Sequence, residues 1–346
     1  MSGPADRPRS AARRAAIALL VLCPIVVLAV ALGLASGAVP LVWRAALFGS
    51  GRDAAILRGL RIPRVLLAAE VGAGLSIAGV ALQALLRNPL ADPFIFGLSG
   101  GAAIGTSLAV LATGTTLGAA TGVAASFFGI LPAQLAACAG AFGAAIFVYT
   151  LGRTRGQLVP ERALLLGVVF NSFASALVIA LQAVLAPERT QALLLWLSGT
   201  LGYETTPVLV AAGVAVLLPA LLLTALAGRL NLLALGDDSA AALGVDVGLT
   251  RGLAFAAASI AVGMSVALTG LVGFVGLVVP HAVRSVTGPD HRVLLPASAL
   301  GGAAFLVLAD AVARMLFRGL GTEPPVGAIT ALVGAPVFVL LLRRRG

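Results

Sequence analysis

Charged side chains are absent from a run of sixty residues, 93–152, which contains no Asp, Glu, Lys, Arg or His. A membrane-crossing helix needs about twenty predominantly apolar residues, so this run is long enough for at least two crossings. One buried helix of a soluble protein cannot account for it. The whole chain is 60% hydrophobic and 10% charged, whereas about a quarter of the residues in a soluble domain are charged. We therefore expect an all-α membrane protein.

Apolar segments of spanning length recur along the chain. The same length rule predicts about ten transmembrane helices, at 15–39, 63–86, 94–111, 132–151, 163–185, 206–228, 252–270, 271–283, 293–316 and 325–342. The eighth is short, and the segment 116–131 has room for an additional interfacial or broken helix. We expect a tail at 1–14 followed by a single polytopic domain at 15–346. An even number of crossings places both termini on one side of the membrane.

Arginine distribution predicts the orientation, because arginines near span ends favour the cytoplasmic face. With both termini in the cytoplasm, fifteen of the 23 arginines lie on the cytoplasmic side and eight on the other. Five of those eight gather between the first two spans: Arg44, Arg52, Arg58, Arg61 and Arg64. The tail is thus expected to be cytoplasmic, and the clustered arginines are expected to face outward.

Several functional classes do not fit this composition. The net charge is +10, but the basic residues separate apolar spans and do not form a basic polar domain with aromatic platforms, so nucleic-acid binding is not expected. The chain has no lysine, which a Walker-type phosphate loop needs. We expect no catalytic residue and no bound cofactor, so any ATP and Mg²⁺ would be used by a partner ATPase. The two cysteines and two histidines are too far apart in sequence to suggest a metal site.

A distant internal echo suggests two pseudo-symmetric halves around a central path, an arrangement common in transporters. Twice, an apolar run stops at a proline-bearing polar corner and resumes in a Gly-Gly-Ala segment. The first corner and its continuation contain Asn88, Pro89, Asp92, Pro93, Gly97, Ser99, Gly100 and Gly101, and the second contains Gly273, Gly276, Pro280 and His281. Proline ends helices, and Asn or Asp can satisfy the freed backbone groups in a turn. The glycines either let helices pack closely or keep a pathway wide.

Two carboxylates fall inside apolar spans, Glu70 and Asp310. Such groups are costly in a membrane and are commonly functional. An ion-coupled secondary transporter that uses both is therefore the rival hypothesis. Arg314 follows Asp310 by four residues, so an ion pair on one helix face is the alternative for Asp310.

The interval 229–251 is the longest polar connection in the second half and is cytoplasmic in the predicted topology. Asp237, Asp238 and Ser239 offer a helix start. Gly244 can end this helix in the left-handed conformation. We expect a short rigid helix on the cytoplasmic face that could seat in a groove of another protein.

Five segments, in order, resemble the FecCD family of permeases: Arg-Ile-Pro-Arg at 61–64, Asn-Pro-Leu-Ala-Asp-Pro at 88–93, Leu-Ala-Leu-Gly-Asp-Asp at 233–238, Gly-Phe-Val-Gly-Leu-Val-Val-Pro-His at 273–281 and Asp-His-Arg at 290–292. These permeases are the membrane subunits of type II ATP-binding cassette importers for ferric siderophores, haem and cobalamin. The resemblance runs from about residue 61 to residue 342.

The resemblance implies a homodimer in the bacterial inner membrane, with two cytoplasmic ATPase subunits and a periplasmic binding protein that delivers a metal chelate. By matching motifs, it implies that Arg61, Arg64 and Arg314 dock acidic residues of the binding protein. Snorkelling membrane anchors are the alternative for these arginines. It also implies that the predicted cytoplasmic helix couples to the ATPase, through Leu235, Gly236, Asp237, Asp238, Ser239, Ala240, Leu243 and Gly244. The motifs do not distinguish between the three kinds of chelate.

Overall fold

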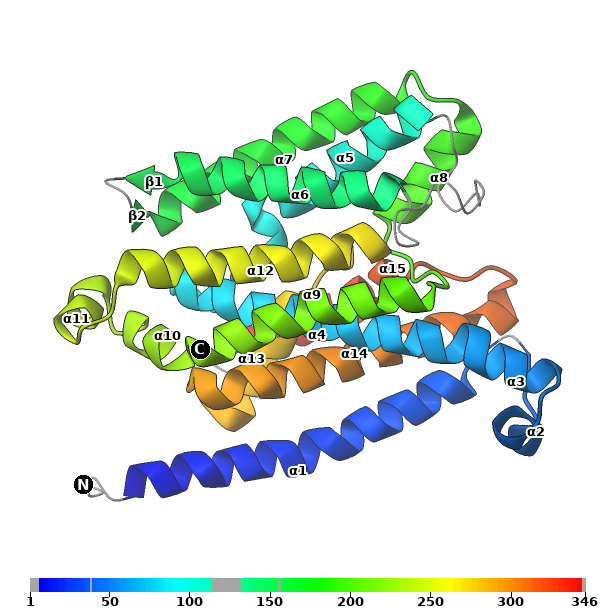
Figure 1. Ribbon diagram of the computed structural model, residues 1–346, viewed down its shortest axis with the longest axis horizontal. Helices are drawn as coiled ribbons and strands as arrows, with labels where there is room; N and C mark the ends of the chain where they lie inside the picture. The colour runs from blue at the N-terminus through cyan, green and yellow to red at the C-terminus, as the bar shows by residue number, and fades with distance from the viewer. Residues whose placement is uncertain (1–5, 38, 114–131, 155–156, 344–346) are drawn as a thin grey trace.

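The computed structural model describes residues 6–37, 39–113, 132–154 and 157–343, which form a bundle of helices aligned roughly along one long axis (Figure 1). The elements of the first half are α1 (Asp6–Ala35), α2 (Trp43–Phe48), α3 (Arg52–Ile56), the π-helix η1 (Leu57–Arg61), α4 (Ile62–Leu86), the 3₁₀-helix η2 (Pro93–Phe96), α5 (Leu98–Thr113), α6 (Pro132–Leu151), β1 (Arg153–Thr154), β2 (Gln157–Leu158) and α7 (Pro160–Gln182). Those of the second half are α8 (Pro187–Leu197), α9 (Thr206–Ala225), α10 (Ala227–Leu233), α11 (Asp237–Ala242), α12 (Val247–Thr269), α13 (Val275–Thr287), α14 (His291–Leu320) and α15 (Val326–Arg343).

The all-α prediction is confirmed, and each of the ten predicted spans coincides with a helix. Among the described residues, six helical segments are long and apolar enough to cross a membrane: Arg52–Leu86, Pro132–Leu151, Pro160–Gln182, Thr206–Ala225, Val247–Thr269 and His291–Phe317. Shorter apolar helices occupy Leu20–Ala35, Leu98–Ala112 and Val326–Leu340. Helix α1 begins at Asp6, so most of the expected tail is continuous with the first span. The segment 116–131 lies outside the described residues.

Helix α4 is the centre of the bundle. It packs against α9, α12, α13 and α14. In the most apolar 18-residue stretch of the segment Arg52–Leu86, which contains α4, 78% of the residues are buried. A helix that is apolar on all sides belongs in a core. By contrast, only 17% of the residues in the most apolar 18-residue stretch of α7 are buried. Helix α7 therefore has an apolar surface left for lipid or for another subunit.

Close helix crossings depend on paired glycines. A Cβ atom at Gly79 of α4 would lie 1.9 Å from the carbonyl oxygen of Gly276 in α13. A Cβ at Gly101 of α5 would lie 2.2 Å from the carbonyl oxygen of Gly140 in α6. The backbones therefore touch at these crossings, as in other membrane helix pairs with small residues at the interface. This contact accounts for Gly101 and Gly276 by packing.

The expected second corner at Pro280 is wrong, because Pro280 lies inside α13. The break comes earlier, between α12 and α13, where Gly270 and Phe274 have positive φ angles of 69° and 68°. A proline within a helix deprives the carbonyl four residues earlier of its donor, which here is that of Gly276. The side-chain amide of Gln83 donates to this oxygen at 3.4 Å. A donor from a neighbouring helix can in this way replace the backbone hydrogen bond that a proline removes from a membrane helix. The internal echo therefore does not hold element by element.

Candidate functional sites

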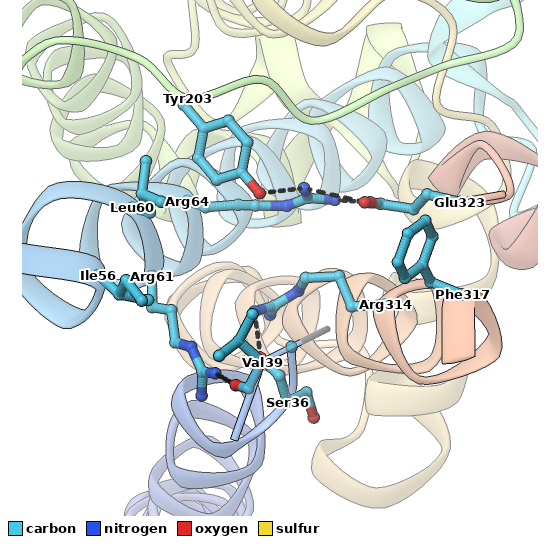
Figure 2. Close-up of a pocket in the computed structure, with 11 residues that line it drawn as sticks. Ser36, Val39, Ile56, Leu60, Arg61, Arg64, Tyr203, Arg314, Phe317 and Glu323 are labelled. Atoms are coloured by element: carbon cyan, nitrogen blue, oxygen red, sulfur yellow. Dashed lines mark hydrogen bonds and ion pairs between the residues drawn. The ribbon is translucent and has the colours of Figure 1, made fainter. Parts of the chain in front are cut away.

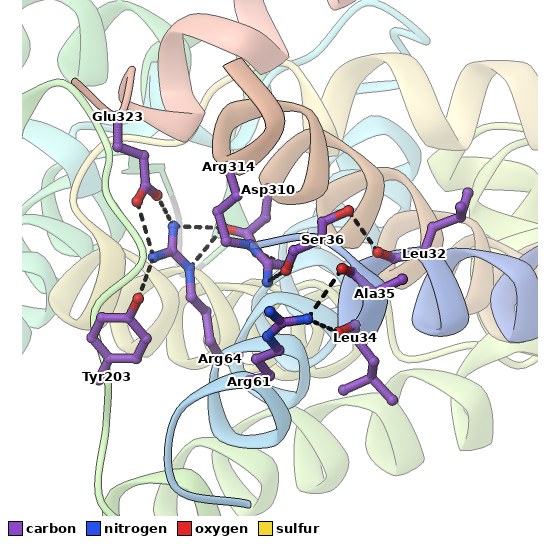
Figure 3. A network of polar contacts seen from close by, with 10 residues as sticks. All are labelled: Leu32, Leu34, Ala35, Ser36, Arg61, Arg64, Tyr203, Asp310, Arg314 and Glu323. Atoms are coloured by element: carbon purple, nitrogen blue, oxygen red, sulfur yellow. Dashed lines mark hydrogen bonds and ion pairs between the residues drawn. The ribbon is translucent and has the colours of Figure 1, made fainter. Parts of the chain in front are cut away.

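Three predicted docking residues meet at one end of the bundle, the end that carries α2 and α3 (Figure 1). Arg61 is the last residue of η1, Arg64 lies in the first turn of α4, and Arg314 lies on α14. Together with Asp310 and Glu323 they form what we call the arginine network (Figure 3). The three arginines are only 3–5% exposed, so their side chains are largely covered by other parts of the subunit.

Arg64 holds the centre of the network. Its Nε donates to Asp310 Oδ1 at 2.9 Å, and one terminal nitrogen lies 2.8 Å from the same oxygen. The guanidinium also forms an ion pair with Glu323. On its other side lies Tyr203, with the hydroxyl 3.4 Å away and the ring centroid 5.4 Å away. Arginine suits such a node because its planar fork binds carboxylates and stacks on aromatic rings.

Asp310 is shared between two arginines. It is completely buried, and its Oδ2 lies 2.7 Å from a terminal nitrogen of Arg314, which confirms the predicted pair four residues apart. Figure 3 shows the carboxylate between the guanidinium groups of Arg64 and Arg314. Its charge is therefore compensated by two cations, unlike that of a carboxylate reserved for a transported ion.

Arg61 and Arg314 also hold the end of α1. The last carbonyls of a helix lack backbone partners, and positive charge is favourable there. Arg61 donates to the carbonyls of Leu34 and Ala35 at 2.6 and 3.0 Å. Arg314 donates to the carbonyl of Ser36 at 2.8 Å. Two predicted docking residues thus have a structural task within the subunit.

A cavity of about 260 Å³ opens beside the network (Figure 2). Its walls include Arg61, Arg64, Arg314, Tyr203 and Glu323. Tyr203 and Glu323 are not predictable from the sequence, because neither belongs to a motif and they lie 139 and 259 residues from Arg64. The arginines at this end that are exposed instead are Arg44, Arg52 and Arg58.

At the opposite end of the bundle, α11 confirms the predicted short helix (Figure 1). Gly244 has the expected left-handed conformation, with φ +83°. Leu235 and Leu243 are exposed, whereas Ala240 is fully buried. Asp238 and Ser239 are exposed as well. The two leucines that flank α11 are therefore exposed at this end of the bundle, outside the candidate spans, and exposed apolar side chains suit contact with another protein.

Asp237 does not cap α11 as expected. Helix α11 begins after Gly236, which has φ +116° and no side chain that could cap it. The carboxylate of Asp237 instead forms ion pairs with Arg87, which follows α4, and with Arg251 of α12, at 2.8 Å from the latter. The carboxylate is thus paired within the subunit, although the side chain remains 38% exposed.

The first predicted corner is a polar turn between α4 and η2. The side chain of Asn88 accepts a hydrogen bond from the backbone N–H of Leu90 at 2.9 Å. Asp92 accepts one from Phe94 at 2.8 Å and so caps η2. Pro89 lies inside the first of these turns, between Asn88 and Leu90. These are the backbone-satisfying roles predicted for Asn88 and Asp92.

The remaining corner residues are placed by packing. Pro93 opens η2, and Gly97 ends it with φ +81°. Ser99 Oγ lies 3.5 Å from the carbonyl of Phe94. A Cβ at Gly100 would lie 2.8 Å from that of Ala174 in α7.

His281 and Gly273 belong to the second expected corner, and their surroundings differ from each other and from those of Glu70. His281 is buried, and its ring meets that of Phe338 on α15 edge-on, with centroids 6.3 Å apart. The space at Gly273 is more open, since a Cβ there would first meet Phe94 at 4.0 Å. Glu70 lies against α9, where its Oε1 would be 3.0 Å from a Cβ at Gly213. It is not part of the arginine network.

Known proteins with the same arrangement identify the class. The model of the FecCD transport family matches residues 19–344. A solved structure described as an inward-facing metal-chelate type ABC transporter superposes with a TM-score of 0.80 at 31% identity, covering 95% of this chain and 99% of that one. The chain therefore belongs to the FecCD transport family and is a multi-pass permease of an ABC importer, in which a separate subunit hydrolyses ATP.

Individual relatives agree with this assignment. The chain is 43% identical over 299 residues to the cobalamin import system permease protein BtuC of Halobacterium salinarum, covering 86% of this chain and 76% of that one. It is 38% identical over 327 residues to the hemin transport system permease protein HmuU of Yersinia pestis, covering 93% and 94%. These matches overturn the rival hypothesis of an ion-coupled secondary transporter based on Glu70 and Asp310.

Proposed function

We propose that this chain is one of two identical permease subunits that import a bulky metal chelate across the bacterial inner membrane. The cargo class is a ferric siderophore, haem or cobalamin, and the relatives named for cobalamin and hemin import support it. The two ATPase subunits bind ATP and Mg²⁺ in the cytoplasm, and a periplasmic binding protein delivers the chelate. The metal arrives already coordinated, so the pathway needs no metal ligands of its own.

The observation that carries this proposal is the placement of two contact regions at opposite ends of one bundle. Helix α4 begins beside Arg61 in the arginine network and ends at Arg87, which is paired to α11. An importer needs such an arrangement, because a delivery protein and an ATPase bind on opposite faces of the membrane. Both termini, with the tail at 1–14, and the segment 229–251 are cytoplasmic in this proposal, and 15–346 is one permease domain.

Docking of the binding protein uses the arginine network in our proposal. Arg64 is paired with Asp310, which is fully buried, and with Glu323, whose side chain is 35% exposed. An acidic residue of the binding protein could replace the more exposed partner, Glu323, without removing the buried one. Bidentate arginine–carboxylate pairing would fix the orientation of the complex as well as its affinity.

Coupling uses the exposed face of α11. Leu235 and Leu243 flank the helix and are both exposed. Apolar side chains at that end of the bundle fit a groove on the ATPase. Glycines at both ends of α11, Gly236 and Gly244, set its orientation through their positive φ angles.

A cargo panel tests this proposal. The complete transporter, assembled from this chain, its ATPase and its binding protein, is reconstituted in vesicles and offered haem, cobalamin and a ferric siderophore in parallel. We expect ATP-dependent accumulation of one of them. Accumulation of none, by a preparation whose ATPase responds to the binding protein, would contradict the metal-chelate assignment.

A further inference from the structure

One carboxylate connects α11 to two helices of the bundle. Asp237 Oδ1 accepts a hydrogen bond from Arg251 at 2.8 Å and also pairs with Arg87. Arg251 lies near the start of α12, and Arg87 directly follows α4. A shift of α11 would therefore pull on the cytoplasmic ends of two membrane helices through a single side chain.

The same arginines reach two further elements. Arg251 donates to the carbonyl of Leu158 in β2 at 3.3 Å, which ties in the hairpin between α6 and α7. Arg87 donates through Nε to the carbonyl of Leu233, the last residue of α10, at 3.2 Å. Asp237 is thus the shared acceptor of a cluster that joins α4, α10, α12 and β2 to α11.

Packing alone does not fix α11 on this side. A cavity of about 500 Å³ lies beside the cluster, and Arg87, Glu161, Asp237 and Arg251 are among its lining residues. The side chain of Arg251 is only 5% exposed, so its cation has little water around it. A buried guanidinium needs its carboxylate partner more than an exposed one does. Ala240 packs α11 against the bundle, and the ion pairs of Asp237, whose side chain is 38% exposed, hold the side of the helix next to this cavity.

We propose that Asp237 is an internal latch that transmits movement of α11 to α4 and α12, and is not a contact residue for the ATPase. Asp237 is then a positioning residue, and the contacts with the ATPase fall to the exposed leucines that flank α11, Leu235 and Leu243. The inference rests on the proposed coupling role of α11. Helix α4 continues from the latch to the arginine network, so it is the element by which the nucleotide state of the ATPase would reach the docking end.

The neighbouring residue supplies a matched control. Asp238 is an aspartate on the same short helix, is exposed, and has no ion pair among the described residues. Asp237→Asn and Asp238→Asn therefore remove the same charge from the same helix, and only the first removes the latch. Asp237→Glu keeps a carboxylate within reach of the arginines and is the conservative variant.

The test measures ATP hydrolysis and cargo uptake together in vesicles that contain the complete transporter. Asp237→Asn should keep ATP hydrolysis within about twofold of the unmodified protein and lower uptake per ATP at least about fivefold, as expected when a coupling free energy between sites is lost. Asp238→Asn should leave the ratio unchanged, and Asp237→Glu should restore part of it. Equal ratios in the two asparagine variants, or loss of ATPase binding in Asp237→Asn, would overturn the latch.

A second measurement does not depend on transport. Hydrogen exchange of α11 in the permease alone should be faster in Asp237→Asn than in Asp238→Asn, because only the first loses its attachment to α4 and α12. Equal exchange would overturn the latch. If the unmodified transporter shows no ATP-dependent uptake while exchange responds as expected, the proposed function fails and the attachment of α11 stands.

Discussion

Asp310→Asn tests whether the arginine network is held by a buried charge. The substitution keeps the size of the side chain but removes the charge that faces Arg64 and Arg314, whose side chains are 4% and 6% exposed. Removing one partner from a buried ion pair costs about 3–5 kcal/mol, because an uncompensated charge stays behind. Glu323 still pairs with Arg64, so we expect a cost near the lower limit, about 3 kcal/mol.

Thermal unfolding of the purified permease in detergent measures this effect. A loss of about 3 kcal/mol should lower the apparent Tm by about 6 °C, at about 2 °C per kcal/mol for a large chain. Glu188→Gln is the matched control, since Glu188 is exposed on α8 at the same end of the bundle (Figure 1). It should change the Tm by less than about 1 °C, because isolated surface charges contribute little. Similar Tm values for the two variants would refute the argument that Asp310 compensates buried arginines.

Two further predictions concern polar groups elsewhere. Gln83→Leu removes the amide that donates to the carbonyl of Gly276, so it should lower the free energy of unfolding by about 1–3 kcal/mol. Gln191→Leu, on the exposed face of α8, should lower it less. Equal unfolding midpoints for the two variants would contradict this role of Gln83. Burial raises the pKa of Glu204, although a hydrogen bond from Gln134 opposes the shift. The protonated form is thus favoured by folding, and the stability that it contributes is lost as pH rises through the raised pKa. Glu204→Gln should therefore be at least as stable as the unmodified protein at neutral pH, and the difference in Tm should close as the pH falls toward the ordinary glutamate pKa of 4.5. A difference in Tm that does not change with pH would contradict this sign.

Local patterns were sufficient to predict most of the architecture. Runs of apolar residues marked the positions of the ten helices, and the polar interval 229–251 marked α11, because both features depend on residues close together in sequence. The pair between Asp310 and Arg314 was predictable for the same reason, as one helix turn brings them together.

Contacts between distant segments were not predictable from one sequence. Pro280 has the local signature of a helix end, yet α13 continues through it, and Gln83 on α4 donates to the carbonyl that the proline leaves without a backbone donor. Likewise, Glu323 reaches Arg64 across 259 residues, and no periodicity in the sequence records this. The same limitation hid the burial of the arginines, since the end of α1 that covers Arg61 belongs to a segment without a distinctive motif.

The central claim is that this chain moves its cargo only with an ATPase and a delivery protein. Uptake into vesicles is the direct test, with the complete transporter, with the ATPase omitted, with the binding protein omitted, and with an imposed proton or sodium gradient in place of ATP. We predict uptake from the complete transporter with ATP and none from the other three. Gradient-driven uptake in the absence of the ATPase would contradict the account.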